Sequence, residues 1–183
     1  MKRWQSLAPA LMGMLALGYL SAMIASGAMP VQRQLSRFEA KGLLTLPPER
    51  IHRVELRRGG EQLLTLRRAG ETEWTTADGR PIGAAAALVG TALTMMRNAG
   101  PVREIDAAEL SGIDTAPFGL DPPRLSAALY AEGEAPVLTA GFGERNPEGY
   151  LQYMRIDGDA RLFLMSRFVG AEWDAAMTAA AGP

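Results

Sequence analysis

An uncharged stretch at the start of the chain sets the first limit on its fold. Lys2 and Arg3 are followed by no charged residue from Trp4 to Gln32, and residues 7–29 are almost wholly apolar or small. At about 1.5 Å per residue, a helix of this length spans the roughly 30 Å hydrocarbon layer of a bilayer. We therefore predict a transmembrane signal-anchor helix over residues 1–30.

A cleaved signal peptide is the competing interpretation of the same residues. Ser26-Gly27-Ala28 offers small side chains suitable for a peptidase. The apolar run is longer than the roughly 7 to 15 residues of a typical signal-peptide core, which favours retention of the helix. Cleavage remains an alternative.

The basic residues on the two sides of the run bear on its orientation. Arg33, Arg37 and Lys41 outnumber Lys2 and Arg3, and the positive-inside rule counts both sides. Because the leader is short, we still expect the N-terminus in the cytoplasm and the C-terminal domain in the periplasm. The expected location is the bacterial inner membrane, with a single pass.

Small residues mark one side of the predicted helix. Gly18, Ala22 and Ser26 are four positions apart, so they share a stripe where another backbone can approach closely. This spacing predicts helix packing with other integral membrane subunits, although small residues are also common in membrane helices in general.

Residues 31–46 follow as a predicted stalk or linker. Val31, Leu35 and Phe38 recur at helical spacing among polar residues, which is typical of an amphipathic helix. Gly42 would end this helix, and Pro47-Pro48 leads into the next domain.

Residues 47–178 carry the pattern of an α+β domain. The runs 52–58, 61–68 and 73–76 alternate or are bounded by turn residues, and 83–98 is an Ala-rich helix pattern. After a turn-rich segment, 102–123, four further short runs predict an antiparallel meander, and a closing helix follows Ser166. The residues expected to face the core are Leu88, Ala92, Met95 and Met96 on the helix 83–98, and Phe168, Trp173, Ala176 and Met177 on the closing helix. We predict a mainly antiparallel sheet with two packed helices, a degenerate repeat of strands and helix, and a flexible tail over 179–183.

Composition and charge exclude several classes of function. The chain has 19 basic and 20 acidic side chains, which gives no strong field for nucleic acid. It contains no cysteine and one histidine, His52, so thiolate chemistry is absent and a histidine-based metal cluster is excluded. We expect no cofactor, no metal site and no catalytic residue.

Several local motifs have structural explanations that outrank chemistry. Gly141-Phe142-Gly143 lacks the spacing and the following helix of a phosphate loop, so we interpret it as the end of a strand. The Asp157-Gly158-Asp159 segment is a turn, because a calcium loop needs more oxygen ligands. Glu132 and Glu134 likewise lie at a turn. The methionines fit apolar faces better than a copper site. The predicted hairpin is basic, with Glu55 and Glu61 interspersed, so cross-strand ion pairing is favoured over binding of lipid headgroups. Its arginines are Arg53, Arg57, Arg58, Arg67 and Arg68.

A set of short motifs in the domain is shared with a known family. The motifs are the opening strand 51–57, Trp74, the turn Phe118-Gly119-Leu120-Asp121-Pro122-Pro123, and Gly141-Phe142-Gly143 followed by Gly149-Tyr150-Leu151-Gln152-Tyr153. These motifs resemble the DUF4340 family of bacterial envelope proteins. The resemblance covers about residues 47–178. It implies an extracytoplasmic domain behind one membrane helix, in some members alongside transport systems related to gliding motility, and it supplies no catalytic residues.

Two functions fit these features. The first is a non-catalytic accessory or scaffold subunit of a larger inner-membrane complex, which presents its periplasmic domain to partner subunits. The alternative is a membrane-tethered periplasmic module that binds envelope glycan or lipid, associated with an ABC-type transport system. The predicted partner or ligand surface contains Trp74, Tyr150 and Tyr153, with Tyr130 as a further apolar platform. A hydrolase is the least supported function, because no clustered reactive groups are visible.

Overall fold

The computed structural model describes residues 7–25, 41–59 and 62–182. The described chain divides into an N-terminal helix, α1 (Leu7–Ala25), and an α+β domain that contains the residues from 41 onward.

Apolar side chains lie on every side of α1. The helix has 19 residues, and Met12, Met14 and Leu17, which point in different directions around it, are 74%, 76% and 67% exposed. In the three ranges given above, no helix is both long enough and apolar enough to cross a membrane. The structure therefore does not support the membrane-spanning prediction for residues 1–30. The predicted stalk helix over 31–40 lies outside the described residues.

The domain is built on one eight-stranded sheet in which every neighbouring pair of strands is antiparallel. The strand order is β3-β2-β1-β5-β6-β7-β8-β4. This confirms the predicted α+β class with a mainly antiparallel sheet. The strands are β1 (Arg53–Arg58), β2 (Gln62–Arg68), β3 (Trp74–Thr76), β4 (Arg103–Ile105), β5 (Leu125–Tyr130), β6 (Leu138–Arg145), β7 (Leu151–Ile156) and β8 (Leu162–Ser166).

The sheet consists of two meanders that meet at its centre. β1 and β5 are neighbours there, with Val54 opposite Leu129 in the register. From β1 the sheet continues through β2 and β3, and from β5 through β6, β7 and β8. Each meander leads to a helix, α2 (Ala85–Asn98) or α3 (Arg167–Ala181). The internal repeat itself stays a prediction.

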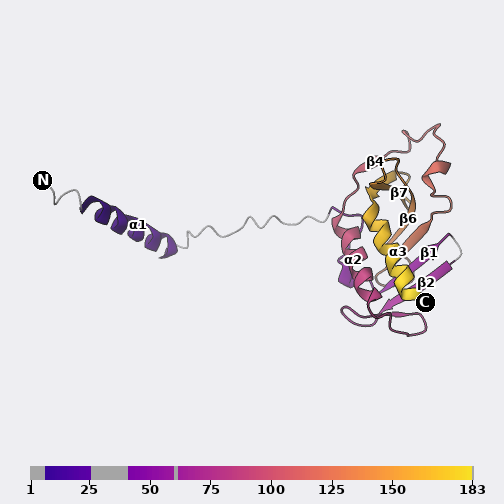
Figure 1. Ribbon diagram of the computed structural model, residues 1–183, viewed down its shortest axis with the longest axis horizontal. Coiled ribbons are helices and arrows are strands. Elements are labelled where there is room, and N and C mark those ends of the chain that lie inside the picture. Colours follow the sequence, from indigo (N-terminus) through magenta and orange to yellow (C-terminus); the bar gives the residue numbers. More distant parts are fainter. Residues whose placement is uncertain (1–6, 26–40, 60–61, 183) are drawn as a thin grey trace. The chain divides into compact units, whose positions relative to one another are not determined.

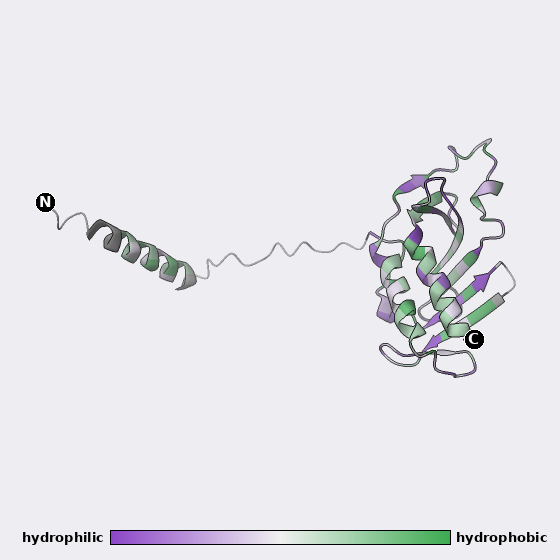
Figure 2. Cartoon of the chain, in the orientation of Figure 1, coloured by the Kyte–Doolittle hydropathy of each residue, from purple (hydrophilic) through white to green (hydrophobic). Residues whose placement is uncertain are grey.

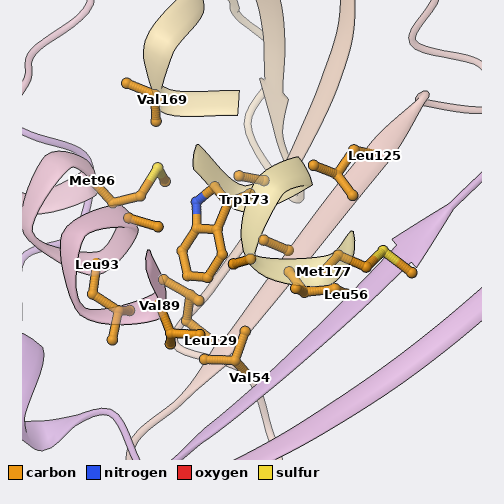
Figure 3. Close-up of a cluster of buried hydrophobic side chains, with 14 of the residues drawn as sticks. Val54, Leu56, Val89, Leu93, Met96, Leu125, Leu129, Val169, Trp173 and Met177 are labelled. Atoms are coloured by element: carbon orange, nitrogen blue, oxygen red, sulfur yellow. The ribbon is translucent and has the colours of Figure 1, made fainter. Parts of the chain in front are cut away.

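Both helices pack side by side on one face of the sheet (Figure 1). Alternation along β1 places Val54 and Leu56 against them. Figure 2 shows that the strands carry both hydrophobic and hydrophilic residues. Trp173 of α3 is 0% exposed and lies at the centre of the core. Its ring is surrounded by side chains from α2, β1 and β5 (Figure 3), among them Val54, Leu56, Val89, Leu93, Met96 and Leu129.

The buried stripes of the two helices differ in part from the prediction. On α2, Val89 and Leu93 are fully buried, whereas Leu88 and Met95, which were predicted to face the core, are half-buried. On α3, Trp173, Ala176 and Met177 are buried as predicted. The inward prediction for Phe168 is wrong, since its side chain is 59% exposed.

The domain begins earlier in the chain than its proline pair. The Gly42 and Leu44 amides donate to the carbonyl oxygens of Arg97 and Met96 at the end of α2, over 2.8 and 3.0 Å. Leu44 is 2% exposed, so this segment packs into the core. Residues 42–46 were predicted to be linker. Their apolar leucines and these backbone hydrogen bonds make them part of the domain instead.

Two further segments differ from the sequence-based expectation. Residues 103–105, inside the segment predicted as turn-rich, form β4 and pair with β8 at the sheet edge. The closing helix continues to Ala181, and Ala180 is 2% exposed. A flexible tail from residue 179 is therefore not what the structure shows up to residue 181.

Candidate functional site

The predicted membrane-packing residues are only partly described. Gly18 and Ala22 both lie in α1, and a Cβ atom added to Gly18 would meet no other atom within 4 Å. Ser26 lies outside the described residues. Helix packing through this stripe stays a prediction.

The three aromatic residues predicted as one surface do not come together. Trp74 is 2% exposed, with the Arg68 guanidinium 4.5 Å from its ring centroid, so it belongs to the core. Tyr153 is half-buried and its ring centroid lies 4.4 Å from that of Phe118. β3 and β7 lie far apart in the sheet order. Only Tyr150, 74% exposed, presents its ring to solvent.

The segment 141–143 and the turn 118–123 are in close steric contact. Gly141 and Gly143 lie on the face of β6 opposite the helices, because their neighbour Phe142 is buried against the core. A Cβ atom on Gly143 would overlap the Phe118 carbonyl oxygen and lie 2.9 Å from Leu120 Cγ. Glycine is therefore required so that residues 116–123 can cross this face. The segment serves packing, and it is not a phosphate loop.

The acidic pairs are engaged in turns and ion pairs. Asp159 accepts hydrogen bonds from the Arg161 side chain over 3.0 and 2.7 Å, and these bonds hold the pKa of Asp159 below its usual range. Glu132 pairs with Arg50 over 2.7 Å. Across the described part of the chain, no group of three or more His, Cys, Asp or Glu side chains is placed to hold a metal ion.

The basic hairpin is divided between the two faces of the sheet. Arg53, Arg57 and Arg67 point away from the helices, and Arg53 lies directly opposite Arg67 in the register. Arg53 pairs with Glu55 of its own strand over 3.7 Å and stacks on the Tyr130 ring at 3.8 Å. The predicted cross-strand pairing with Glu55 is thus a pairing along one strand. Glu61 lies outside the described residues.

Two exposed aromatic rings occur at the N-terminal end of α3. Tyr150 ends the turn that leads into β7, and Phe168 lies in the first turn of α3; they are 74% and 59% exposed. The Arg167 amide donates to the Tyr150 carbonyl oxygen over 3.2 Å, which joins the two backbone segments. The Arg167 guanidinium lies 5.0 Å from the Phe168 ring centroid. We call these three residues the aromatic corner.

A groove of about 710 Å³ extends along one side of α3. The α3 residues that line it recur every three or four positions, so they form one stripe of the helix, and most are too small to fill the space. They are Arg167, Gly170, Ala171, Asp174, Ala175, Thr178 and Ala179. The remaining lining residues come from α2, from the ends of β1, β6 and β7, and from the start of β5, and are Arg58, Leu88, Arg124, Leu125, Arg145 and Gln152. We call this the α3 groove.

Gln152 has a fixed place in the α3 groove. Its Nε2 atom donates to the Gly143 carbonyl oxygen over 2.9 Å. Its Oε1 atom lies where a Cβ atom on Gly170 would be, so only glycine at position 170 lets the amide lie against α3. The helix and the strand ends are therefore in close contact at this point.

The α3 groove is strongly positive. It is lined by four arginines and one carboxylate, Asp174. Arg58 neutralises Asp174 over 2.6 Å and also donates to the Thr178 hydroxyl over 2.9 Å. Among the side chains that the structure describes, Arg145 and Arg167 have no ion-pair partner. Two guanidinium groups therefore remain available to an anion.

Comparison with known proteins finds no match to this chain. No protein-family model, no curated protein sequence and no solved structure is similar to it. The aromatic corner and the α3 groove are therefore the features of the domain that bear on its function.

Proposed function

We propose that this protein is a non-catalytic accessory subunit of a bacterial inner-membrane complex, which presents its α+β domain to partner subunits. The observation that carries the proposal is the aromatic corner, where two rings are more than half exposed on adjacent segments of a well-packed domain. Exposed aromatic and arginine side chains are the residues that most often anchor protein interfaces.

The composition of the corner supports a protein partner. Tyr150 and Phe168 offer large apolar area, and the Tyr150 hydroxyl can also donate a hydrogen bond. The Arg167 guanidinium lies beside the Phe168 ring and can donate to a carboxylate or carbonyl oxygen on the partner. Scattered single apolar residues on a surface need no explanation, but an aromatic pair with an arginine resembles the core of an interface.

Attachment to the membrane is part of the same proposal and rests on the N-terminal sequence. Lys2 and Arg3 precede an uncharged run that ends before Arg33. A helix that is apolar on all sides is stable only when it is surrounded by other apolar groups, such as lipid or partner helices. Gly18, Ala22 and Ser26 would face a partner helix.

The absence of catalysis is inferred from the sequence inventory. One histidine and no cysteine leave few ways to build a nucleophile and its base. His52 is exposed and lies just before β1, beside Glu49 and Arg68. Arg68 is already engaged, since it donates to the Ile51 and Pro48 carbonyl oxygens.

The experiment compares variants of the tagged full chain extracted from bacterial membranes in a mild non-ionic detergent. We expect Tyr150→Ala/Phe168→Ala to remove co-purifying subunits without changing the thermal midpoint, because both side chains are exposed. Ile113→Ala/Val137→Ala is the matched control, since these residues are 52% and 43% exposed elsewhere. Equal recovery of partners with both double variants, or a partner-free wild-type chain, would count against the proposal.

A further inference from the structure

We propose that the α3 groove binds a ligand that carries a phosphate group, held by the guanidinium groups of Arg145 and Arg167. This site differs from the aromatic corner, because it binds a small anionic ligand and the corner binds a protein. Arg167 borders both. Unpaired positive charge, the orientation of α3 and the shape of the groove all favour such a ligand.

The free charge is concentrated at one end. Arg145 is exposed at the end of β6, and its backbone is opposite Gln152 in the register of β6 and β7. Arg167 begins α3, where the Tyr150 carbonyl oxygen fixes its backbone. Guanidinium groups match the tetrahedral oxygens of phosphate with paired N–H donors, which a single ammonium does not. A phosphate is therefore the anion that these two residues recognise best.

The orientation of α3 adds to the field at the same end. The N-terminus of a helix carries a partial positive charge, and the first turn of α3 contains no acidic residue to offset it. Asp174, the one carboxylate in the groove, lies two turns further along and is already paired with Arg58. An anion at the Arg145 end thus meets no unpaired carboxylate of the lining.

The shape of the groove indicates a ligand longer than phosphate alone. From Arg167 to Ala179 the lining stripe covers about 18 Å along the helix axis, at about 1.5 Å per residue. Gly170, Ala171 and Ala175 form a shallow, neutral floor between the two ends. At the far end lies Thr178, whose hydroxyl accepts from Arg58 and donates to the Asp174 carbonyl oxygen. A phosphate ester fits this arrangement, with its remainder extending along the small residues.

Soluble phosphate esters and phospholipid headgroups share this chemistry. The test titrates the full chain, in non-ionic detergent and at low ionic strength, with glycerol 3-phosphate and pyrophosphate as the soluble probes. Dihexanoyl phosphatidylglycerol is the lipid probe, and dihexanoyl phosphatidylcholine is its zwitterionic comparison. Calorimetry gives the dissociation constant. Binding is assigned to the α3 groove only where a substitution in the groove reduces the heat measured with the wild-type chain.

Four variants separate the site from general charge attraction. Arg145→Ala should weaken binding about tenfold or more, as expected for the loss of a charge-assisted hydrogen bond. Arg145→Lys should recover only part of the affinity, because it keeps the charge and loses the paired donors. Ala175→Leu fills the exposed floor without changing the charge and should also weaken binding. Arg67→Ala, which removes an exposed strand arginine on the opposite face, is the matched control and should bind as wild type.

The outcomes distinguish the sources and can overturn the site. If only the soluble probes bind through the groove, the ligand is a free phosphate ester. If only phosphatidylglycerol binds through the groove, the ligand is a phospholipid headgroup. Both results support the proposal. The proposal is overturned if no probe binds the folded wild-type chain, if Arg67→Ala weakens binding as much as Arg145→Ala, or if Ala175→Leu leaves every dissociation constant unchanged. Loss of partners in the aromatic-corner experiment would not alter any of these results.

Discussion

The carbonyl oxygen of Phe118 occupies the position that a Cβ atom on Gly143 would need. The segment 116–123 thereby lies directly on the backbone of β6, and the neighbouring Gly141 is in close contact with Pro123, whose Cβ would be 3.2 Å from an added Cβ atom. The turn 118–123 and the segment 141–143 therefore pack together as one unit.

Gly143→Ala should lower the free energy of unfolding by about 3 kcal/mol, because the opposing atom belongs to the backbone and cannot rotate away. Gly90→Ala is the matched control within α2. An added Cβ there meets nothing within 4 Å, so it should raise the free energy of unfolding by about 0.5–1 kcal/mol. Urea unfolding of both variants measures the difference. A neutral Gly143→Ala variant would contradict the contact between the two motifs.

Trp173 supplies a test of the core. Its indole is fully buried, and Nε1 has no hydrogen-bond partner in the described domain. Trp173→Ala should cost about 3–5 kcal/mol, as expected for truncation of a large buried ring. Trp173→Phe should cost less than about 1.5 kcal/mol, since it also removes an unpaired buried donor. Similar losses in the two variants, measured by urea unfolding, would show that the indole N–H has a partner.

Acid should destabilise the domain through Asp159 and Asp78. A hydrogen bond from Arg161 lowers the pKa of Asp159, and one from the Thr76 hydroxyl lowers the pKa of Asp78. For a lowered pKa, the stabilisation is present above the unfolded value, near 4, and is lost as the pH falls through the folded value. In Asp159→Asn, the free energy of unfolding, measured by urea unfolding at a series of pH values, should fall less steeply below about pH 4 than in the wild type. Asp157→Asn, which removes a nearby carboxylate that has no ion pair with a described side chain, should change this slope less.

Alkali should destabilise the domain through Tyr130. Burial raises the pKa of the Tyr130 phenol, and its hydrogen bond to Glu55 over 3.0 Å raises that pKa further. For a raised pKa, the stabilisation is complete below the unfolded value, about 10, and is lost as the pH rises through the folded value. Tyr130→Phe should therefore reduce the fall in thermal midpoint between pH 9 and 11. An unchanged alkaline fall would contradict the role of this phenol.

Strand alternation made much of the fold predictable. Val54 and Leu56 alternate with charged residues on β1, and every predicted strand run corresponds to a strand of the sheet. β4 could not be found in this way, because Arg103 and Glu104 are polar and exposed and lie in a turn-rich segment. Its pairing with β8 depends on a tertiary contact that local sequence does not encode.

The candidate sites were less predictable. Phe168 could have been placed outside the core, since it lies five residues before Trp173 and thus off the buried stripe of α3. The α3 groove was not accessible to local reasoning. Arg58 and Arg145 are far apart in the sequence and meet only because β5 pairs with both β1 and β6.

Docking through the aromatic corner is tested most directly in living cells. A photo-crosslinking phenylalanine analogue replaces Tyr150 in the full chain, and a second strain carries it at Ile113, which is 52% exposed elsewhere in the domain. The account predicts a discrete adduct of higher mass from position 150 that is absent from position 113 and disappears when Phe168→Ala is added. Identical patterns from the two positions, or no adduct from position 150 at normal expression, would contradict it.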